Sequence, residues 1–501
     1  MIRNILDYLE KSADCNGNKS AFVGEHSRLT FAEFRDRARR IGSCLAGRIK
    51  KGEPVAVFMD KTPEAIAAFL GVVYAGGCYV PVDVSSPLRR VEMIFETLQN
   101  RYVIADAANA GKSPAEKYNC TEIIYTDAIE TEISEDILTA IYRQMIDCDP
   151  LYIIFTSGST GIPKGVVQSH RAVIDFTEWF SETACFDSDT VFGNQAPFYF
   201  DMSVKDIYGT LRNGATDFIV PKQLFSFPSM FFAYINENKI NTLTWAVSAM
   251  SICADEEALA ESTPQCLRCI CFGGEALPVK ALNLWRKYLP DAMYMNMYGP
   301  TEVAVDCTYY IVDREFENTE HLPAGRPCYN TDILILNGDE PAKTNEIGEI
   351  CVRGTSLAYG YYNNPEKTKE VFIQNPLQTA YPELIYKTGD LGYFTESGEI
   401  MFSARKDHQI KHMGYRIELG EIESAIGAIN GIHMNCCLYH KEKDKIICVY
   451  TGNLTKKEIV VELTRLLPKY MWPTMFVQLE EMPLNPNGKI DRVRLTKEYI
   501  G

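Results

Sequence analysis

The sequence lacks an apolar run that could cross a membrane, since no stretch of about 18 consecutive apolar residues occurs in it. Near the start, Asp7, Glu10 and Lys11 interrupt the apolar pattern of residues 1–17. This segment therefore predicts an amphipathic helix rather than a signal peptide. Together these features predict a cytoplasmic protein without a membrane span.

Metal-binding and disulfide patterns are also missing, although the chain has 16 cysteines. There is no paired CxxC spacing, and Cys269, Cys271, Cys436 and Cys437 lie in apolar, strand-like runs. Reduced thiols that serve as small apolar side chains explain this pattern best.

Positive charge is in short supply: 50 Lys and Arg stand against 66 Asp and Glu, which gives a net charge of −16. This balance disfavours nucleic-acid binding as the main activity. From Asp407 to the end, however, 13 Lys and Arg stand against 12 Asp and Glu. The near-neutral C-terminal part is therefore predicted to be a separate module.

At 501 residues the chain is too long for one ordinary core. Apolar, strand-like runs such as "EPVAVFM", "CYVPVD" and "LYIIF" alternate with helical patterns such as "TPEAIAAFLGVVYAG". This alternation predicts α/β layers with parallel strands, followed by a smaller β-rich subdomain. We place the domain boundary after residue 404, with a small α+β domain at 405–501.

The segment "TSGSTGIPKG" at 156–165 has the composition of a phosphate-binding loop. Its glycines let backbone N–H groups approach an anion, its hydroxyls can donate hydrogen bonds, and Lys164 adds positive charge. It is not a Walker loop, because Gly165 follows Lys164 where Ser or Thr is required.

This loop resembles the phosphate loop of the adenylate-forming superfamily, which includes acyl-CoA synthetases, luciferases and the adenylation domains of peptide synthetases. Further segments match that superfamily in order along the chain: "YAGGCYVPVD", "FDMS", "FGGEALP", "NMYGPTE", "GEICVRGTSLAYGYY", "YKTGDLG", "ARKDHQIKHMGYRIELGEIE" and "NPNGKIDR". The chain is identified as a member of the superfamily, of the type found in nonribosomal peptide synthetases and D-alanine–carrier protein ligases. The resemblance implies a large α/β domain and a small mobile C-terminal domain.

The resemblance also implies a reaction in two steps. An amino acid and ATP, with Mg²⁺, form aminoacyl-AMP and pyrophosphate, and the aminoacyl group then passes to the phosphopantetheine thiol of a carrier protein. No Gly-Gly-x-Ser attachment motif and no HHxxxDG motif are present. The expected partner is therefore a carrier protein in trans.

Roles in chemistry follow from the resemblance residue by residue. Lys489 would bridge the carboxylate and the α-phosphate, Thr301 would face the phosphate, and Glu302 would hold Mg²⁺. Asp407 would be the hinge of the domain rotation, which brings Lys411 to the active site for the second step.

The expected nucleotide-binding residues come from the phosphate loop and from five later motifs. Tyr298 would stack on adenine, and Asp390 would accept hydrogen bonds from the ribose hydroxyls. The full set is Thr156, Ser157, Gly158, Ser159, Thr160, Gly161, Lys164, Gly274, Glu275, Asn296, Met297, Tyr298, Gly299, Pro300, Thr301, Asp390, Arg405 and Lys489.

The substrate is less determined than the reaction. Asp201 would bind the α-ammonium group of the amino acid, and the expected pocket is Asp201, Met202, Lys205, Thr244, Cys271, Gly273, Met297, Val305 and Asp306. A buried lysine needs a counter-charge. If Lys205 pairs with the substrate, the substrate is acidic and resembles glutamate; if it pairs with Asp306, a small or polar amino acid such as D-alanine remains open. An acyl-CoA synthetase is the alternative of another class, and it would give Asp201 no role.

Overall fold

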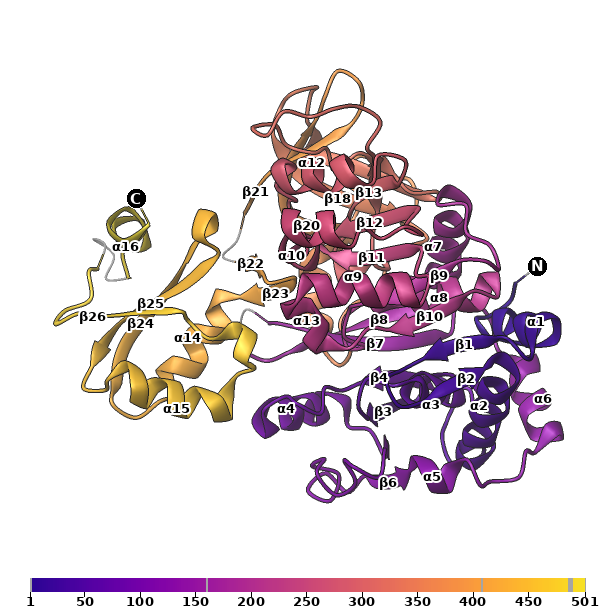
Figure 1. Cartoon of the computed structure of the whole chain (residues 1–501). Coiled ribbons are helices and arrows are strands. Elements are labelled where there is room, and N and C mark those ends of the chain that lie inside the picture. The colour runs from indigo at the N-terminus through magenta and orange to yellow at the C-terminus, as the bar shows by residue number, and fades with distance from the viewer. Residues whose placement is uncertain (1, 159–160, 407–408, 485–489, 501) are drawn as a thin grey trace. The chain divides into compact units, whose positions relative to one another are not determined.

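The computed structural model describes residues 2–158, 161–406, 409–484 and 490–500 (Figure 1). The chain divides into two compact units. The first comprises Met1–Val84, Leu98–Ile154 and Val166–Lys406, and the second comprises Ser85–Thr97, Phe155–Gly165 and Asp407–Gly501. The second unit thus includes the whole of the phosphate loop, 156–165, as well as the C-terminal segment.

Two sheets of mainly parallel strands form the body of the first unit. One has the order β15 (Arg326–Pro327), β14 (Thr308–Ile311), β13 (Met293–Tyr298), β12 (Cys269–Gly273), β11 (Thr242–Ala246), β9 (Val191–Asn194), β10 (Thr216–Ile219), β1 (Ser20–Val23), β2 (Arg28–Thr30). The other has the order β6 (Thr121–Ile124), β5 (Tyr102–Ala105), β3 (Pro54–Phe58), β4 (Cys78–Pro81), β7 (Pro150–Thr156), β8 (Lys164–Ser169).

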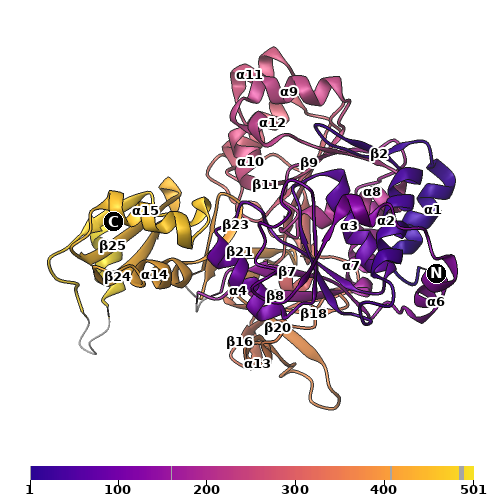
Figure 2. The same ribbon diagram turned by 90° about the horizontal axis from the view of Figure 1, so that it is seen from below.

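The helices of the first unit are α1 (Leu6–Asn16), α2 (Phe31–Leu45), α3 (Pro63–Tyr74), α5 (Tyr125–Ala128), α6 (Glu135–Gln144), α7 (His170–Thr183), α8 (Ser203–Asn213), α9 (Pro228–Glu237), α10 (Val247–Ile252), α11 (Glu256–Glu261), α12 (Val279–Tyr288) and α13 (Pro365–Val371). Helix α1 packs against α2 and α8, and α2 packs against α3 (Figure 2). Every residue of β3 is buried, as expected for a parallel strand with helices on both faces.

The alternation of side chains along β12 assigns its two faces. Ile270 and Phe272 join a core with α9 and α12, whereas Cys269 and Cys271 join the core that contains α7 and α8. The residues of the predicted substrate pocket on this strand therefore face α8.

A third sheet forms the β-rich subdomain of the first unit. Its order is β17 (Glu340–Pro341), β16 (Thr331–Asn337), β18 (Gly348–Gly354), β20 (Leu384–Phe394), β19 (Phe372–Gln374), and β21 (Ile400–Arg405) pairs with β20. A mixed α/β fold with a β-rich subdomain is thus confirmed.

The second unit is α+β. It contains α4 (Leu88–Leu98), the hairpin β22 (Gln409–His412) and β23 (Tyr415–Glu418), and a sheet of β24 (Ile432–His440), β25 (Lys445–Gly452) and β26 (Met475–Gln478). Its other helices are α14 (Leu419–Gly427), α15 (Lys456–Leu466) and α16 (Arg492–Tyr499). A separate core of Ile and Leu side chains, with Ile417 and Ile422 fully buried, holds α14 and α15 against β24 and β25.

The sixteen cysteines are free thiols. None of the helices built from described residues is both long and apolar enough to span a bilayer.

Helices α2 and α3 approach each other closely through two glycines. A Cβ atom on Gly71 would lie 2.5 Å from the Cβ of Ile41, and one on Gly42 would lie 2.5 Å from the Cβ of Tyr74. Neither position has room for a methyl group unless the helices move apart.

We expect Gly71→Ala to destabilise the protein by about 1–3 kcal/mol, because overpacking outweighs the better helix propensity of alanine. Thermal unfolding monitored by circular dichroism would measure this. Gly427→Ala on α14 is the matched control, since its methyl group would meet only the end of the Asn435 side chain, at 3.2 Å. An unfolding midpoint for Gly71→Ala equal to that of the wild type would contradict the close-approach argument.

Candidate active site

The predicted substrate residues gather around the carboxyl ends of β11, β12 and β13. These strands are parallel neighbours, and Ala246, Gly273 and Met297 lie side by side in register. Asp201 and Met202 immediately precede α8, Lys205 lies in its first turn, and Asp306 follows the short helix η2 (Thr301–Val303). The carboxyl ends of parallel strands are where open α/β sheets bind ligands.

Lys205 pairs with Asp306. The distance from Lys205 Nζ to Asp306 Oδ2 is 2.6 Å, and the two side chains are 0% and 5% exposed. The same ammonium group lies 3.7 Å from Met297 Sδ. Of the two partners considered for the buried lysine, the structure therefore supplies Asp306.

Asp201 is buried, and burial raises the pKa of its carboxyl group to about 6, although a hydrogen bond with the side chain of Thr301 opposes the shift. Within the described part of the chain, no ion pair joins Asp201 to a basic side chain. The charge of Asp306 also raises this pKa and that of Lys205 lowers it. A cationic ligand beside Asp201 would stabilise the ionised carboxylate.

The segment that carries Asp306 has a strained backbone. Ala304 and Val305 have φ values of 52° and 78°, in the left-handed region that a β-branched residue rarely adopts. Gly299 permits this conformation, because a Cβ atom there would lie 2.4 Å from Asp306 Cα and 2.7 Å from Val305 O.

Gly273 has no room for a side chain. A Cβ atom at this position would lie 2.6 Å from the backbone oxygen of Met297 on the neighbouring strand. A larger residue here would require β13 to shift.

Thr244 differs from the other predicted pocket residues, because its hydroxyl donates a hydrogen bond to the Asp206 carboxylate. Asp206 belongs to a buried group with Asp217 and Lys61 that the motifs did not indicate. Burial raises the pKa of Asp206 to about 7 and that of Asp217 well above its usual range, and burial lowers the pKa of Lys61 to about 8. Lys61 Nζ donates to the backbone oxygens of Asn194 and Gln195, at 3.2 and 3.1 Å.

Three predicted nucleotide residues form a hydrogen-bonded set in the first unit. The Tyr298 hydroxyl donates to Asp390 Oδ2 at 2.6 Å, and Arg405 donates to Asp390 Oδ1 at 2.5 Å. Strands β20 and β21 place Asp390 directly opposite Arg405. Both carboxylate oxygens of Asp390 thus have a donor, which fixes the orientation of the Tyr298 ring.

The other predicted nucleotide residues of the first unit lie nearby in the chain. Asn296 and Met297 are on β13, Gly299 and Pro300 follow it, Thr301 begins η2, and Gly274 and Glu275 follow β12.

Glu302, the expected Mg²⁺ ligand, is fully buried and accepts a hydrogen bond from the Tyr361 hydroxyl at 2.7 Å. Among the described residues, no group of three or more His, Cys, Asp or Glu side chains could hold a metal ion. A single carboxylate fits Mg²⁺ nevertheless, because this ion is commonly held by one or two carboxylates together with substrate phosphates and water.

The phosphate loop contacts the C-terminal segment of its own unit. Ser157 Oγ donates to the Arg416 backbone oxygen at 2.8 Å and accepts from Glu418 N at 3.2 Å. Gly158 N donates to Glu421 Oε2 at 3.2 Å, and Lys164 Nζ lies 3.6 Å from Glu418 Oε1. The Gly158 N–H group and the Lys164 ammonium group already contact carboxylates, so they are chemically suited to bind phosphate.

Four predicted residues lie outside the described residues: Ser159, Thr160, Asp407 and Lys489. Gly161 and Thr156 lie in the described part of the loop, and Lys411 is on β22, where its backbone oxygen accepts from the Tyr439 hydroxyl at 3.0 Å.

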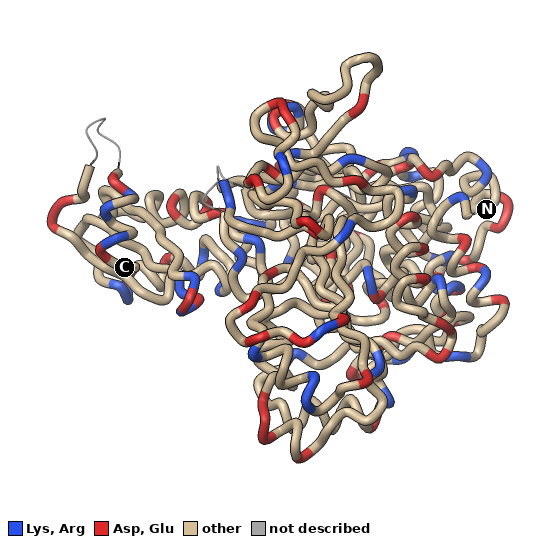
Figure 3. The backbone as a smooth tube through the Cα atoms, turned by 90° about the horizontal axis from the view of Figure 1, so that it is seen from above, with Lys and Arg blue, Asp and Glu red and all other residues tan. Residues whose placement is uncertain are grey.

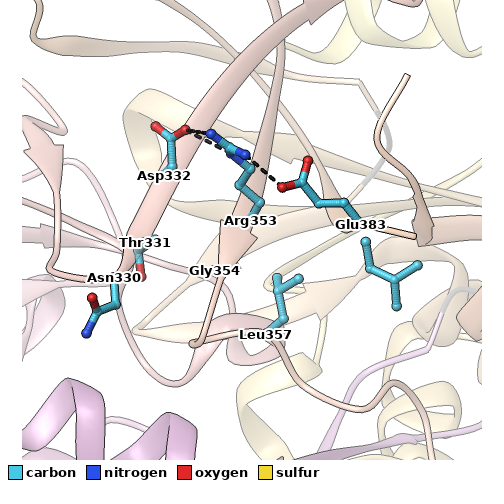
Figure 4. Close-up of a pocket in the computed structure, with 8 residues that line it drawn as sticks. Asn330, Thr331, Asp332, Arg353, Gly354, Leu357 and Glu383 are labelled. Carbon is cyan, nitrogen blue, oxygen red and sulfur yellow. Dashed lines mark hydrogen bonds and ion pairs between the residues drawn. The ribbon is translucent and has the colours of Figure 1, made fainter. Parts of the chain in front are cut away.

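A cavity of about 630 Å³ in the β-rich subdomain contains none of the predicted site residues (Figure 4). Arg353 crosses it and pairs with Asp332 and Glu383, each at 2.8 Å. Acidic and basic residues are scattered over the described chain (Figure 3), and their distribution does not by itself indicate another site.

Comparison with known proteins gives consistent results. The chain is 32% identical to a D-alanine–D-alanyl carrier protein ligase of Bacillus cytotoxicus, with 99% of each chain covered. It is 31% identical to tyrocidine synthase 1 of Brevibacillus parabrevis over 98% of this chain, and it spans 45% of that longer protein.

Solved structures show the same fold. The nonribosomal peptide synthetase protein PA1221, with adenylation and carrier domains, has a TM-score of 0.83 at 22% identity, with 99% of this chain and 84% of that chain covered. The o-succinylbenzoate CoA synthetase of Bacillus subtilis has a TM-score of 0.84 at 20% identity, with 99% and 98% covered.

The model of the AMP-binding enzyme family matches residues 9–362, which include the phosphate loop, the Asp201 segment and the Tyr298–Glu302 motif. The chain therefore belongs to the AMP-binding enzyme family.

Proposed function

We propose that this AMP-forming ligase activates D-alanine, or a closely similar small amino acid, and transfers it to a carrier protein. The observation that carries the proposal is the buried pair of Lys205 and Asp306. The pair neutralises Lys205, the lysine of the predicted pocket that was expected to bind an acidic side chain. Asp201 is then the charged side chain of the predicted pocket that remains to attract a charged group of the ligand.

The charges of the pocket favour an amino acid with a neutral side chain. An acidic side chain would have to displace Asp306 from Lys205, leaving a buried carboxylate without its cation, which is strongly unfavourable. A fatty acid would leave Asp201 without a cation. An α-ammonium group is the cation that suits Asp201, and it is present in every amino acid at neutral pH.

The relatives support the same choice. The D-alanine–D-alanyl carrier protein ligase of Bacillus cytotoxicus matches over its whole length, as does its counterpart in Bacillus anthracis, at 32% identity. The pocket of this chain nevertheless differs from what the ligase resemblance leads one to expect, because Gly273 stands in place of a cysteine and Lys205 in place of an apolar residue. The Lys205–Asp306 pair replaces apolar lining with an ion pair that is neutral overall.

In this mechanism the residues of the chain orient the two anions that must react. Asp201 holds the α-ammonium group, which places the substrate carboxylate near Thr301. The Lys489 ammonium group stabilises the charge that develops between carboxylate and α-phosphate, and Asp390 with Tyr298 positions the ribose and adenine. The nucleotide would bring Mg²⁺, which Glu302 would hold, and the metal would neutralise phosphate charge.

The second step uses a thiol nucleophile. Attack of a phosphopantetheine thiolate on the aminoacyl carbonyl breaks the bond to AMP and forms a thioester. Lys411 would act in this step, and Asp407 would be the hinge of the rotation that brings it there.

The proposal predicts ATP–pyrophosphate exchange that depends on D-alanine. We expect exchange with D-alanine to exceed that with L-glutamate or L-aspartate at least tenfold, since the acidic substrates must break the Lys205–Asp306 pair. A panel of D- and L-amino acids measured with radiolabelled pyrophosphate tests this. Faster exchange with glutamate would overturn the choice of substrate, and exchange with none of the amino acids would overturn the proposed function.

The Asp201 carboxyl group predicts a pH dependence. Its pKa of about 6 lies above the ordinary value, so the carboxylate becomes neutral as the pH falls through 6 and loses its attraction for the α-ammonium group. We expect kcat/KM for the amino acid to fall roughly tenfold between pH 7.5 and pH 5, because this parameter reports free-enzyme ionisations. Steady-state kinetics at saturating ATP would measure it. In Asp201→Asn, the residual kcat/KM should not fall between pH 7.5 and pH 5. An equal fall in that variant would show that the ionisation belongs to another group.

Asp306→Asn should release the Lys205 ammonium group to pair with a substrate. We expect exchange with aspartate or glutamate to rise at least tenfold over that of the wild type, and kcat/KM for D-alanine to fall, because Lys205 is left without a counter-charge unless the substrate side chain supplies one. The exchange panel used for the wild type measures both. Asp332→Asn, which removes a surface partner of Arg353, is the control and should leave the panel unchanged. No gain with acidic substrates would show that Lys205 does not face the bound side chain.

A further inference from the structure

The described part of the phosphate loop already binds anions of its own unit. The Gly158 N–H and the Lys164 ammonium group contact the carboxylates of Glu421 and Glu418, and Ser157 bonds to the backbone beside them. These are the kinds of donor that hold phosphate in glycine-rich loops. Two glutamates of one short segment therefore occupy the positions where phosphate oxygens would be expected.

Arg90, on α4, belongs to the same arrangement. It forms an ion pair with Glu421 Oε1, and the two side chains are 7% and 2% exposed. The other oxygen of Glu421 accepts from Gly158 N. One carboxylate thus bridges a loop N–H group and a guanidinium group. A phosphate group also presents several oxygens on one centre, and guanidinium is well suited to bind it.

The burial of these groups explains why an anion is present. A buried guanidinium or ammonium group without a counter-charge is strongly destabilising. Glu421 and Glu418 supply negative charge to Arg90 and Lys164. A polyphosphate has more charge on more oxygens, so it can replace both carboxylates without leaving Arg90 or Lys164 unpaired, provided that the segment of Glu418 and Glu421 moves so that these carboxylates reach water.

We propose that Arg90 is an anion-binding residue of the phosphate loop, and that Glu418 and Glu421 hold this site closed until a polyphosphate displaces them. The proposal rests on the proposed function in one respect: the polyphosphate is assumed to be the triphosphate of the ATP that the enzyme uses. It gives Arg90 a role beyond the loop motif, and it makes the C-terminal segment a competitor of ATP and of pyrophosphate.

A double-mutant cycle on the full-length protein tests both parts. The ligand is inorganic pyrophosphate with Mg²⁺, titrated calorimetrically without any amino acid. We expect Glu421→Gln to tighten binding roughly tenfold, because an amide competes for the Gly158 N–H and Arg90 more weakly than a carboxylate does. In the Glu421→Gln background, Arg90→Met should weaken binding roughly tenfold, through loss of a charge-assisted contact to phosphate.

Glu423→Gln is the matched control, since Glu423 lies on the same helix and pairs with a different arginine, Arg492. It should bind pyrophosphate as the wild type does. Thermal unfolding would establish that each variant is folded. If Arg90→Met does not fold, Arg90→Lys in the same background should show a smaller loss, because lysine keeps the charge but not the two-pronged geometry.

The outcomes separate the two parts. If Arg90→Met has no effect in the Glu421→Gln background, Arg90 serves only to hold Glu421 and its assignment to the phosphate site is wrong. If neither Glu421→Gln nor Glu418→Gln tightens binding, the two carboxylates do not compete with polyphosphate. The titration contains no amino acid, so its result stands or falls independently of D-alanine activation.

Discussion

A buried carboxylate is stable only with a cation, a hydrogen-bond donor or a proton beside it, and this requirement explains the contacts made by the buried carboxylates of the candidate site. Asp306 forms an ion pair with Lys205, and Asp390 accepts hydrogen bonds from Tyr298 and Arg405. For Asp217, burial raises the pKa well above its usual range, so burial favours the neutral form of this carboxyl group. Asp201 forms no ion pair with a basic side chain in the described part of the chain, and its environment is suited to a cationic group of a ligand.

The same requirement acts on cations in the second unit. Lys164 and Arg90 are buried beside the phosphate loop, and each has a glutamate as its partner. The two sets differ in how readily their partners can be exchanged. Each set lies within one unit, but Lys205 and Asp306 are in contact at 2.6 Å, whereas the contact from Lys164 to Glu418 is longer, at 3.6 Å.

Much of the fold could be predicted from local patterns. The apolar run "EPVAVFM" contains β3, and "TPEAIAAFLGVVYAG" contains α3, which begins after Thr62 as its N-cap and Pro63 at its first position. Strand periodicity also explains why Cys271, Gly273 and Met297 share the face toward α8. Motifs of this kind encode backbone conformation and local chemistry, so short segments are sufficient to recognise them.

Pairings between distant residues could not be predicted in this way. The sequence left open whether Lys205 pairs with Asp306 or with a substrate, because the two residues are a hundred positions apart and the choice depends on where the chain turns after η2. Asp206 lies on α8, Asp217 on β10 and Lys61 between β3 and α3, and each has an ordinary local sequence. Likewise, nothing in the loop motif indicates that its described donors contact Glu418 and Glu421.

The left-handed backbone of Ala304 and Val305 has a consequence for the entropy of binding. Two consecutive non-glycine residues in this region cost about 1–3 kcal/mol each, a free energy that folding supplies and that substrate binding does not. The carboxylate of Asp306 is thus held in place before any ligand arrives. If the proposed pocket is correct, this segment therefore has little conformational freedom left to lose when the amino acid binds.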